Sequence, residues 1–229
     1  TPAHAPLDTI HPPGLSHPAK RGDPLHHQHL FCLYSHPAVY IMILPGLGII
    51  SEIIPVFARK AIFGYKGIVV SSMAIAIAGS LVWAHHMYTS GMSDVSVFVF
   101  SLLTYLVAIP TAVKVFSWVS TMYKGSILMT PPLFMALIFI YLFTVGGLTG
   151  LVLGAAGTDI HVHDPTFVVA HFLFTMFGGT GFAFFAGLHY WWPKMFVIMY
   201  DFKKAYIAAV LATVGFIFHY IPMFILGMQ

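Results

Sequence analysis

The chain has 229 residues, of which 59% are hydrophobic and only 7% charged, with a formal net charge of +3. Soluble domains carry about 25% charged residues, so this composition excludes an ordinary soluble protein and favours a polytopic membrane protein. The small net charge excludes a nucleic-acid-binding protein, and the single cysteine, Cys32, excludes an internal disulfide and a cysteine metal cage.

Apolar runs divide the chain into a leading polar segment and a series of membrane spans. Residues 1–28 are polar and rich in proline and histidine, which predicts an extramembrane outer segment, and residues 29–229 are predicted to form one transmembrane helical core. A spanning helix needs about 20 mostly apolar residues. The sequence therefore predicts an all-α, polytopic transmembrane bundle of about six helices, at 29–57, 67–89, 95–122, 131–155, 166–192 and 204–227.

The basic residues lie unevenly at the two ends of this predicted bundle. The outer end has only Lys20 and Arg21, which precede the first span. The connections at the other end contain Arg59, Lys60, Lys66, Lys124, Lys194, Lys203 and Lys204. The positive-inside rule places that second end in the cytoplasm or matrix. The N-terminal segment and the loops 90–94 and 156–165 are then expected to face outside.

Histidines mark the outer ends of three predicted spans. His36 lies near the start of the first span, His85 and His86 at the end of the second, and His171 near the start of the fifth. Adjacent imidazoles at the edge of a bilayer are costly unless something coordinates them. Imidazole suits copper and haem iron. We therefore expect a three-imidazole metal site, for which the backbone at His85 and His86 must leave regular helical geometry, and a proximal haem ligand at His171.

The histidine motifs, Tyr34-Ser35-His36-Pro37 and Trp83-Ala84-His85-His86-Met87, resemble those of one membrane enzyme family. The chain resembles subunit I of the haem–copper oxidases, which are the cytochrome c and quinol oxidases, over nearly its whole length. The resemblance rests on residues 22–24, 28–31, 34–50, 83–92, 110–118, 163–164, 168–172 and 178–193. It implies that the chain is a fragment of a twelve-helix core, corresponding to its C-terminal half.

The resemblance also implies roles for the histidines. His36, His85 and His86 would bind copper, and His171 would be the axial ligand of a high-spin haem, of the haem A type. A covalent link between His36 and Tyr40 is implied, with Tyr40 as the proton and electron donor to bound oxygen.

A further implication concerns the residues around the first histidine. Tyr34 and Ser35 resemble a branch of the family that lacks a glutamate after the proline, since Ala38 stands at that position. In that branch these two residues are thought to replace the carboxylate in proton transfer.

Lys114 lies in the middle of the third predicted span. A lysine at mid-membrane costs on the order of 3 kcal/mol, so we expect it to face the bundle interior. Thr111 shares its helix face one turn earlier, and Ser51 and Glu52 lie near the inner end of the first span. Ser51 or Glu52, then Lys114 and Thr111, then Tyr40 form a predicted proton path that resembles the lysine channel of the family.

The loop 156–165 contains a second group of polar residues. His163 and Asp164 resemble a magnesium or manganese site of the family, and imidazole with carboxylate suits either metal. Asp159 lies nearby and is expected to contact a haem propionate.

Leu173 is the main departure from the family pattern. It stands two residues after His171, where the family has the histidine that holds a low-spin haem. The low-spin haem is therefore doubtful in this chain. A catalytically silent or scaffolding subunit remains an alternative. So does an enzyme resembling nitric oxide reductase, although the alanine at position 38 supplies no glutamate for a non-haem iron.

The resemblance implies the catalytic subunit of a terminal respiratory oxidase that reduces dioxygen to water and translocates protons. Its expected partners are oxidase subunits II and III, the remaining helices of the core, and cytochrome c or another electron donor. The expected location is the bacterial inner membrane, with the mitochondrial inner membrane as the alternative.

Overall fold

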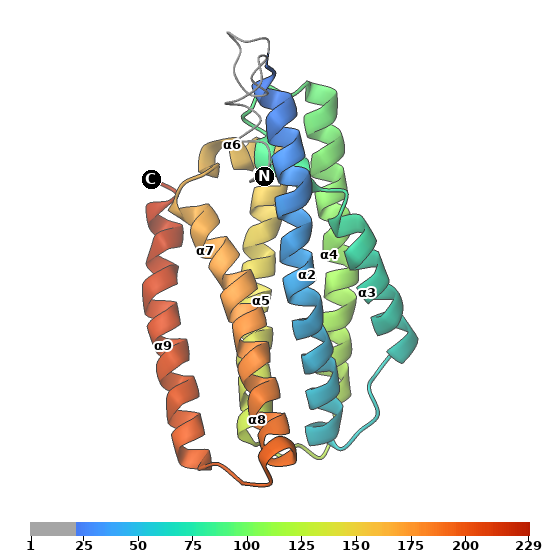
Figure 1. The fold of residues 1–229 in the computed structure, drawn as a ribbon, viewed down its shortest axis with the longest axis vertical. Helices are drawn as coiled ribbons and strands as arrows, with labels where there is room; N and C mark the ends of the chain where they lie inside the picture. Colours follow the sequence, from blue (N-terminus) through green and yellow to red (C-terminus); the bar gives the residue numbers. More distant parts are fainter. Residues whose placement is uncertain (1–21) are drawn as a thin grey trace.

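The structure, a computed structural model, describes residues 22–229, and every regular element in that part of the chain is helical. The helices lie side by side as a bundle (Figure 1). Six segments are long and apolar enough to cross a membrane: Pro24–Ala58, Tyr65–Met87, Asp94–Met122, Pro131–Gly154, Thr166–Phe196 and Phe202–Leu226. The predicted all-α bundle of about six transmembrane helices is confirmed.

The first helix, α2 (Pro24–Ala58), begins earlier than the apolar pattern predicts. The Asp23 carboxylate accepts hydrogen bonds from the backbone N–H groups of Leu25 and His26, and Pro24 occupies the first turn. Both features favour a helix start. Residues 24–28 of the predicted outer segment are thus helical, and residues 1–21 lie outside the described part of the chain.

The second span, predicted at 67–89 with irregular backbone at His85 and His86, is interrupted before these histidines. It consists of α3 (Tyr65–Gly79) and a separate 3₁₀ segment, η2 (Trp83–Met87). Glycine is a poor helix former, and the Ser80 hydroxyl bonds back to the carbonyl of Ala76 at 2.8 Å, which competes with regular helix formation. The break gives His85 and His86 the irregular backbone that joint metal ligation requires.

The remaining elements are α4 (Asp94–Met122), α5 (Pro131–Gly154), α6 (Ala156–Val162), α7 (Thr166–Thr175), η3 (Met176–Gly181), α8 (Phe182–Phe196) and α9 (Phe202–Leu226). The short helix α6 lies in the outer connection expected to be a loop. The fifth span contains the π-helical turn η3 between α7 and α8. Such turns interrupt a helix without ending it and often occur near functional sites.

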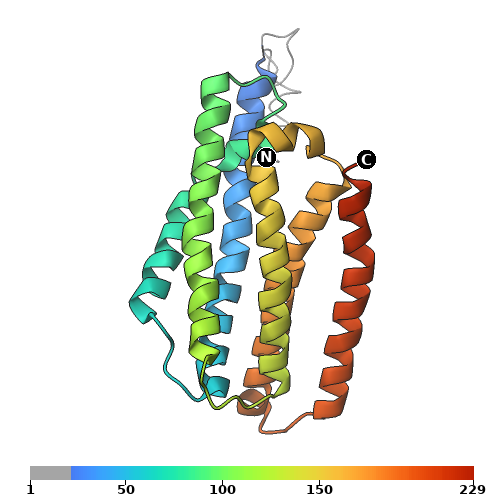
Figure 2. The same ribbon diagram turned by 180° about the vertical axis from the view of Figure 1, so that it is seen from behind.

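The two ends of the bundle differ as the basic residues predict. The segments η2 and α6 lie at the end where α2 begins and α9 finishes, and the connections that contain most basic residues lie at the opposite end (Figure 2). Which end faces the cytoplasm stays a prediction.

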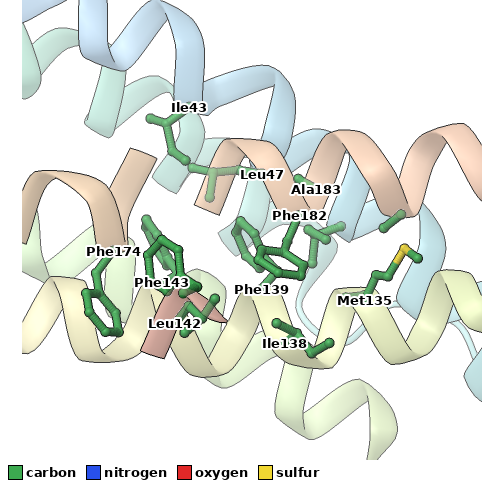
Figure 3. Packing of buried hydrophobic residues seen from close by; sticks show 14 of the residues in the cluster. Ile43, Leu47, Met135, Ile138, Phe139, Leu142, Phe143, Phe174, Phe182 and Ala183 are labelled. Carbon is green, nitrogen blue, oxygen red and sulfur yellow. The ribbon is translucent and has the colours of Figure 1, made fainter. Parts of the chain in front are cut away.

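Aromatic and aliphatic side chains from α2, α5, α7 and α8 fill the centre of the bundle (Figure 3). Phe139 and Phe143 stack at 5.3 Å between ring centroids, and both belong to the cluster that contains Ile43, Leu47 and Phe182. The packing is tight at Gly178, where an added Cβ would lie 2.9 Å from the Cβ of Leu142. This core fixes α2 and α7, which carry His36 and His171.

Candidate metal centre

His36, His85 and His86 meet through their ring nitrogens. His36 Nδ1 lies 3.0 Å from His86 Nε2, and His85 Nε2 lies 3.1 Å from the same atom. In residues 22–229 this is the one group of three or more histidine, cysteine or acidic residues whose ligand atoms converge, all within 4.8 Å of one another. Helix α2 and segment η2 therefore bring together residues that are 50 positions apart.

The chemistry of this donor set fits a metal ion. Three imidazoles with one nitrogen each turned to a common point match a copper or iron site with an open position. His36 Nε2 is buried and has no hydrogen-bond partner among the described residues. The Tyr40 ring lies next to it, with its centroid 4.9 Å from that of His36. Tyr40 is thus placed beside the predicted copper ligand to which the resemblance would link it.

Thr104 on α4 orients His85. Its hydroxyl donates to the carbonyl of Phe100 at 2.7 Å and lies 3.0 Å from His85 Nδ1. The hydroxyl oxygen can therefore accept a hydrogen bond from the Nδ1–H group of His85, which leaves the lone pair of Nε2 for the cluster. Partners of this kind fix the tautomer of a metal-bound histidine. The sequence pattern does not single out Thr104, because its role depends on a contact between two helices.

His171 on α7 has its own orienting contacts. Its Nδ1 lies 2.9 Å from the carbonyl oxygen of Gly146 and 3.2 Å from Thr149 Oγ1. Donation to the carbonyl leaves Nε2 as the free ligand atom, which suits a proximal haem ligand. Gly150 provides the space, since an added Cβ would lie 2.8 Å from His171 Cε1. Gly146, Thr149 and Gly150, all on α5, are further residues that the sequence pattern does not identify.

A cavity of about 690 Å³ joins the two sets of histidines. Cofactor and small-molecule sites typically have roughly 300–1,000 Å³, so the volume suits an organic cofactor. Its wall contains the three clustered imidazoles and His171, together with the predicted proton-path residues Tyr40 and Thr111. Residues from the predicted copper site, haem site and proton path therefore face one space.

The predicted outer metal residues also line this cavity. His163 Nδ1 lies 2.5 Å from Asp159 Oδ2, and His163 Nε2 lies 3.8 Å from Asp164 Oδ2. Asp159 is buried, and burial raises the pKa of its carboxyl group, although the hydrogen bond with His163 opposes that shift. The three residues lie together, and their roles toward magnesium, manganese or a haem propionate stay predictions.

Lys114 is buried, with 2% of its surface exposed, as its position in the span predicts. Its Nζ donates to Ser72 Oγ on α3 at 2.6 Å, a partner that the sequence pattern does not reveal. Ser51 instead accepts a hydrogen bond from Trp118 Nε1 at 2.9 Å, and Glu52 is exposed. No hydrogen bond joins either residue to Lys114 in the described structure, so an entry through Ser51 or Glu52 stays a prediction.

Tyr34 and Ser35 lie on α2 one helical turn or less before His36. Tyr34 is 69% exposed and Ser35 is half-buried. Neither residue lines the cavity. The contribution of Tyr34 and Ser35 to proton transfer therefore stays a prediction.

Comparisons with known proteins give a consistent picture. A family model described as cytochrome C and quinol oxidase polypeptide I matches residues 5–229. Cytochrome c oxidase subunit 1 of Synechocystis is 46% identical over 97% of this chain and 40% of its own length. The probable cytochrome c oxidase subunit 1-alpha of Streptomyces avermitilis is 48% identical over 86% of this chain and 34% of its own length. The chain thus spans about 40% or less of these curated relatives.

A solved structure of a heme-copper terminal oxidase dimer has the same fold. The TM-score is 0.70 at 22% sequence identity, and the match covers 76% of this chain and 34% of that chain. At this identity the likeness concerns the fold alone. It agrees with the all-helical membrane bundle described above.

Proposed function

Because the chain belongs to the family of cytochrome c and quinol oxidase polypeptide I, we propose that it forms the oxygen-reducing part of a haem–copper terminal oxidase. The reaction is the reduction of dioxygen to water with electrons from cytochrome c or another carrier, coupled to proton translocation. The observation that carries the proposal is the convergence of three imidazoles on a cavity whose wall also contains His171.

His36, His85 and His86 would hold copper, and His171 would hold the iron of a high-spin haem of the A type. When bound, the copper and the haem iron supply the electrons and the Lewis acidity that dioxygen reduction needs. The chain's contribution is to fix the ligands: Thr104 and the Gly146 carbonyl each hold one ring nitrogen, so that the other faces the cavity.

Tyr40 and Lys114 would handle protons. The Tyr40 phenol lies at the cavity wall, one helical turn after His36, where it can give a proton and an electron to the reacting oxygen. Lys114 is held by Ser72, and Thr111 lies one turn earlier on α4 and lines the cavity. In the proposed path, protons pass from Lys114 by way of Thr111 to Tyr40.

The proposal extends to the assembly. The six apolar spans require a membrane, and the relatives named above are bacterial, which favours the bacterial inner membrane over the mitochondrial one. Oxidase subunits II and III, the remaining helices of the core and the electron donor complete the proposed enzyme. Asp159, His163 and Asp164 would bind magnesium or manganese near the haem propionates.

The test is a metal and haem count in the purified assembly, alongside the double variant His85→Ala/His86→Ala. We expect one copper per chain in the parent, and loss of both copper and oxygen uptake in the double variant. His189→Ala is the matched control, because among the described residues that imidazole hydrogen-bonds only the Phe185 carbonyl on its own helix, at 2.8 Å, and its ring contacts Tyr200 rather than the site. A parent without copper or haem would support the silent scaffold, and iron in place of copper would support the nitric oxide reductase-like alternative.

A further inference from the structure

The last turn of α5 ends at a buried residue and needs hydrogen-bond donors from outside the helix. The final carbonyl groups of an α-helix have no partner within it, and a carbonyl group without a partner is costly away from water. Gly154, the last residue of α5, is buried and lines the cavity. Its carbonyl group must therefore find donors on another part of the chain.

Two hydroxyl groups supply these donors. The phenol of Tyr88, the residue that directly follows η2, donates to the Gly154 carbonyl oxygen at 3.2 Å. The Ser101 hydroxyl on α4 donates to the same oxygen at 2.7 Å. About one turn earlier on α5, the Leu151 carbonyl accepts a hydrogen bond from the Tyr105 phenol of α4 at 3.0 Å. Side chains from the end of η2 and from α4 thus cap the end of α5.

The same contact brings the support of a proposed copper ligand against α5. Tyr88 comes three residues after His85 and is only 7% exposed. Its phenol also interacts with the hydroxyl of Thr104, which lies 3.0 Å from His85 Nδ1. Gly154 permits this close approach, because an added Cβ would lie 3.1 Å from Thr104 Cγ2. The Tyr88 hydroxyl therefore connects the end of α5 to the residue that orients His85.

The residues that position His171 lie on the same helix. The Gly146 carbonyl oxygen lies 2.9 Å from His171 Nδ1, and Gly150 leaves the space for the imidazole ring. Gly150 and Gly146 come about one and two helical turns before Gly154. A displacement of the end of α5 would therefore also displace the groups that hold His171.

The hydrogen-bonded end of α5 thus links the two sets of histidines. We propose that Tyr88 and Ser101 are positioning residues for the oxygen site. By docking the end of α5 onto η2 and α4, they set the distance between the copper site at His85 and the haem site at His171. This inference rests on the proposed function and goes beyond it, since neither Tyr88 nor Ser101 lines the cavity.

Carbon monoxide is the probe of this distance. It binds the iron of a reduced high-spin haem, and its stretching frequency responds to the charge and the space on the open side of the haem.

The first experiment compares infrared spectra of the reduced, carbon monoxide-saturated assembly for the parent and for Tyr88→Phe, which keeps the ring and removes the hydroxyl. We expect unchanged copper and haem contents and a C–O band that is shifted or split relative to the parent. A band identical to that of the parent would overturn the proposal. Loss of copper would overturn it too, because residues that only set the spacing leave the ligands in place.

Tyr206→Phe is the matched control. It loses the same kind of hydrogen bond, from the Tyr206 phenol to the Met129 carbonyl at 2.9 Å, just before α5 begins. Its C–O band should match that of the parent, and a shift as large as in Tyr88→Phe would show a general loss of packing and overturn the proposal. Ser101→Ala should shift the band, whereas Ser101→Thr, which keeps a hydroxyl, should restore the parent spectrum.

The double variant Tyr88→Phe/Ser101→Ala tests whether both hydroxyls act on one carbonyl group. Each single variant leaves one of the two donors at Gly154, whereas the double variant removes both, so its band shift should exceed the sum of the single shifts. Additive shifts would contradict a shared carbonyl. If the parent contains copper and haem but its band responds to neither residue, this inference fails while the proposed function stands. If the parent contains no copper and binds no carbon monoxide, both fail.

Discussion

Tyr40 packs its ring directly against the backbone of Gly79, so that a Cβ added to Gly79 would lie 2.7 Å from both Cδ2 and Cε2 of the ring. The contact joins α2 to the last residue of α3, where the second span breaks. The missing side chain at Gly79 therefore sets where the phenol lies relative to His36.

Gly79→Ala is expected to displace Tyr40 while leaving the three proposed copper ligands in place. A misplacement of about 1 Å near a reacting centre can cost around 10²-fold in rate, so we expect oxygen uptake to fall at least tenfold at unchanged copper content. Gly48→Ala is the control, because an added Cβ there meets nothing within 4 Å. Equal oxygen uptake in Gly79→Ala and the parent would show that the position of Tyr40 is not critical.

The sequence predicts the spans and the depth of the histidines because both depend on local pattern. Apolar runs of sufficient length define membrane helices, and alternating topology brings His36, His85 and His171 to one end. The sequence also requires irregular backbone at His85 and His86, and the structure supplies it as the 3₁₀ segment η2. The position of the break, at residues 80–82, does not follow from hydropathy, since that stretch is as apolar as its neighbours.

Residues that orient other side chains could not be predicted from local pattern. Thr104, Ser72 and Gly146 each act on a residue of another helix, at 19, 42 and 25 positions' separation. Threonine, serine and glycine are also common in membrane helices for packing reasons. Their roles emerge only when the helices are placed together, whereas charged Lys114 is identifiable from the cost of leaving it in lipid.

Thr104→Val should weaken copper binding. Valine has a similar shape but cannot accept a hydrogen bond from the Nδ1–H group of His85, and loss of such a contact typically costs 10–100-fold in metal affinity. Copper retention measured against a graded chelator series would show this loss. Thr213→Val is the control, because within residues 22–229 its hydroxyl hydrogen-bonds only the Ala209 carbonyl on its own helix, at 2.7 Å. Matching chelator curves for Thr104→Val and the parent would remove Thr104 from the site.

Gly150→Ala should reduce haem retention. The new Cβ would lie 2.8 Å from His171 Cε1, and the ring must turn away and weaken the hydrogen bond to Gly146. We expect high-spin haem per chain to fall severalfold while copper remains. Gly48→Ala is again the control, since Gly48 does not line the cavity and its added Cβ meets nothing within 4 Å. Full haem content in Gly150→Ala would mean that His171 does not hold the haem.

Ser72→Ala removes the hydroxyl that accepts the hydrogen bond from buried Lys114. An unsatisfied buried donor costs about 1–3 kcal/mol, and more when charged, so the lysine side chain should reorient and proton delivery should slow. We expect oxygen uptake to fall about tenfold and the fall to be reversed in Ser72→Thr, which keeps a hydroxyl. Ser80→Ala serves as the control, because in the described part of the chain that exposed hydroxyl hydrogen-bonds only the Ala76 carbonyl. Lys114→Met should abolish proton-coupled turnover altogether, and normal oxygen uptake in that variant would exclude the lysine path.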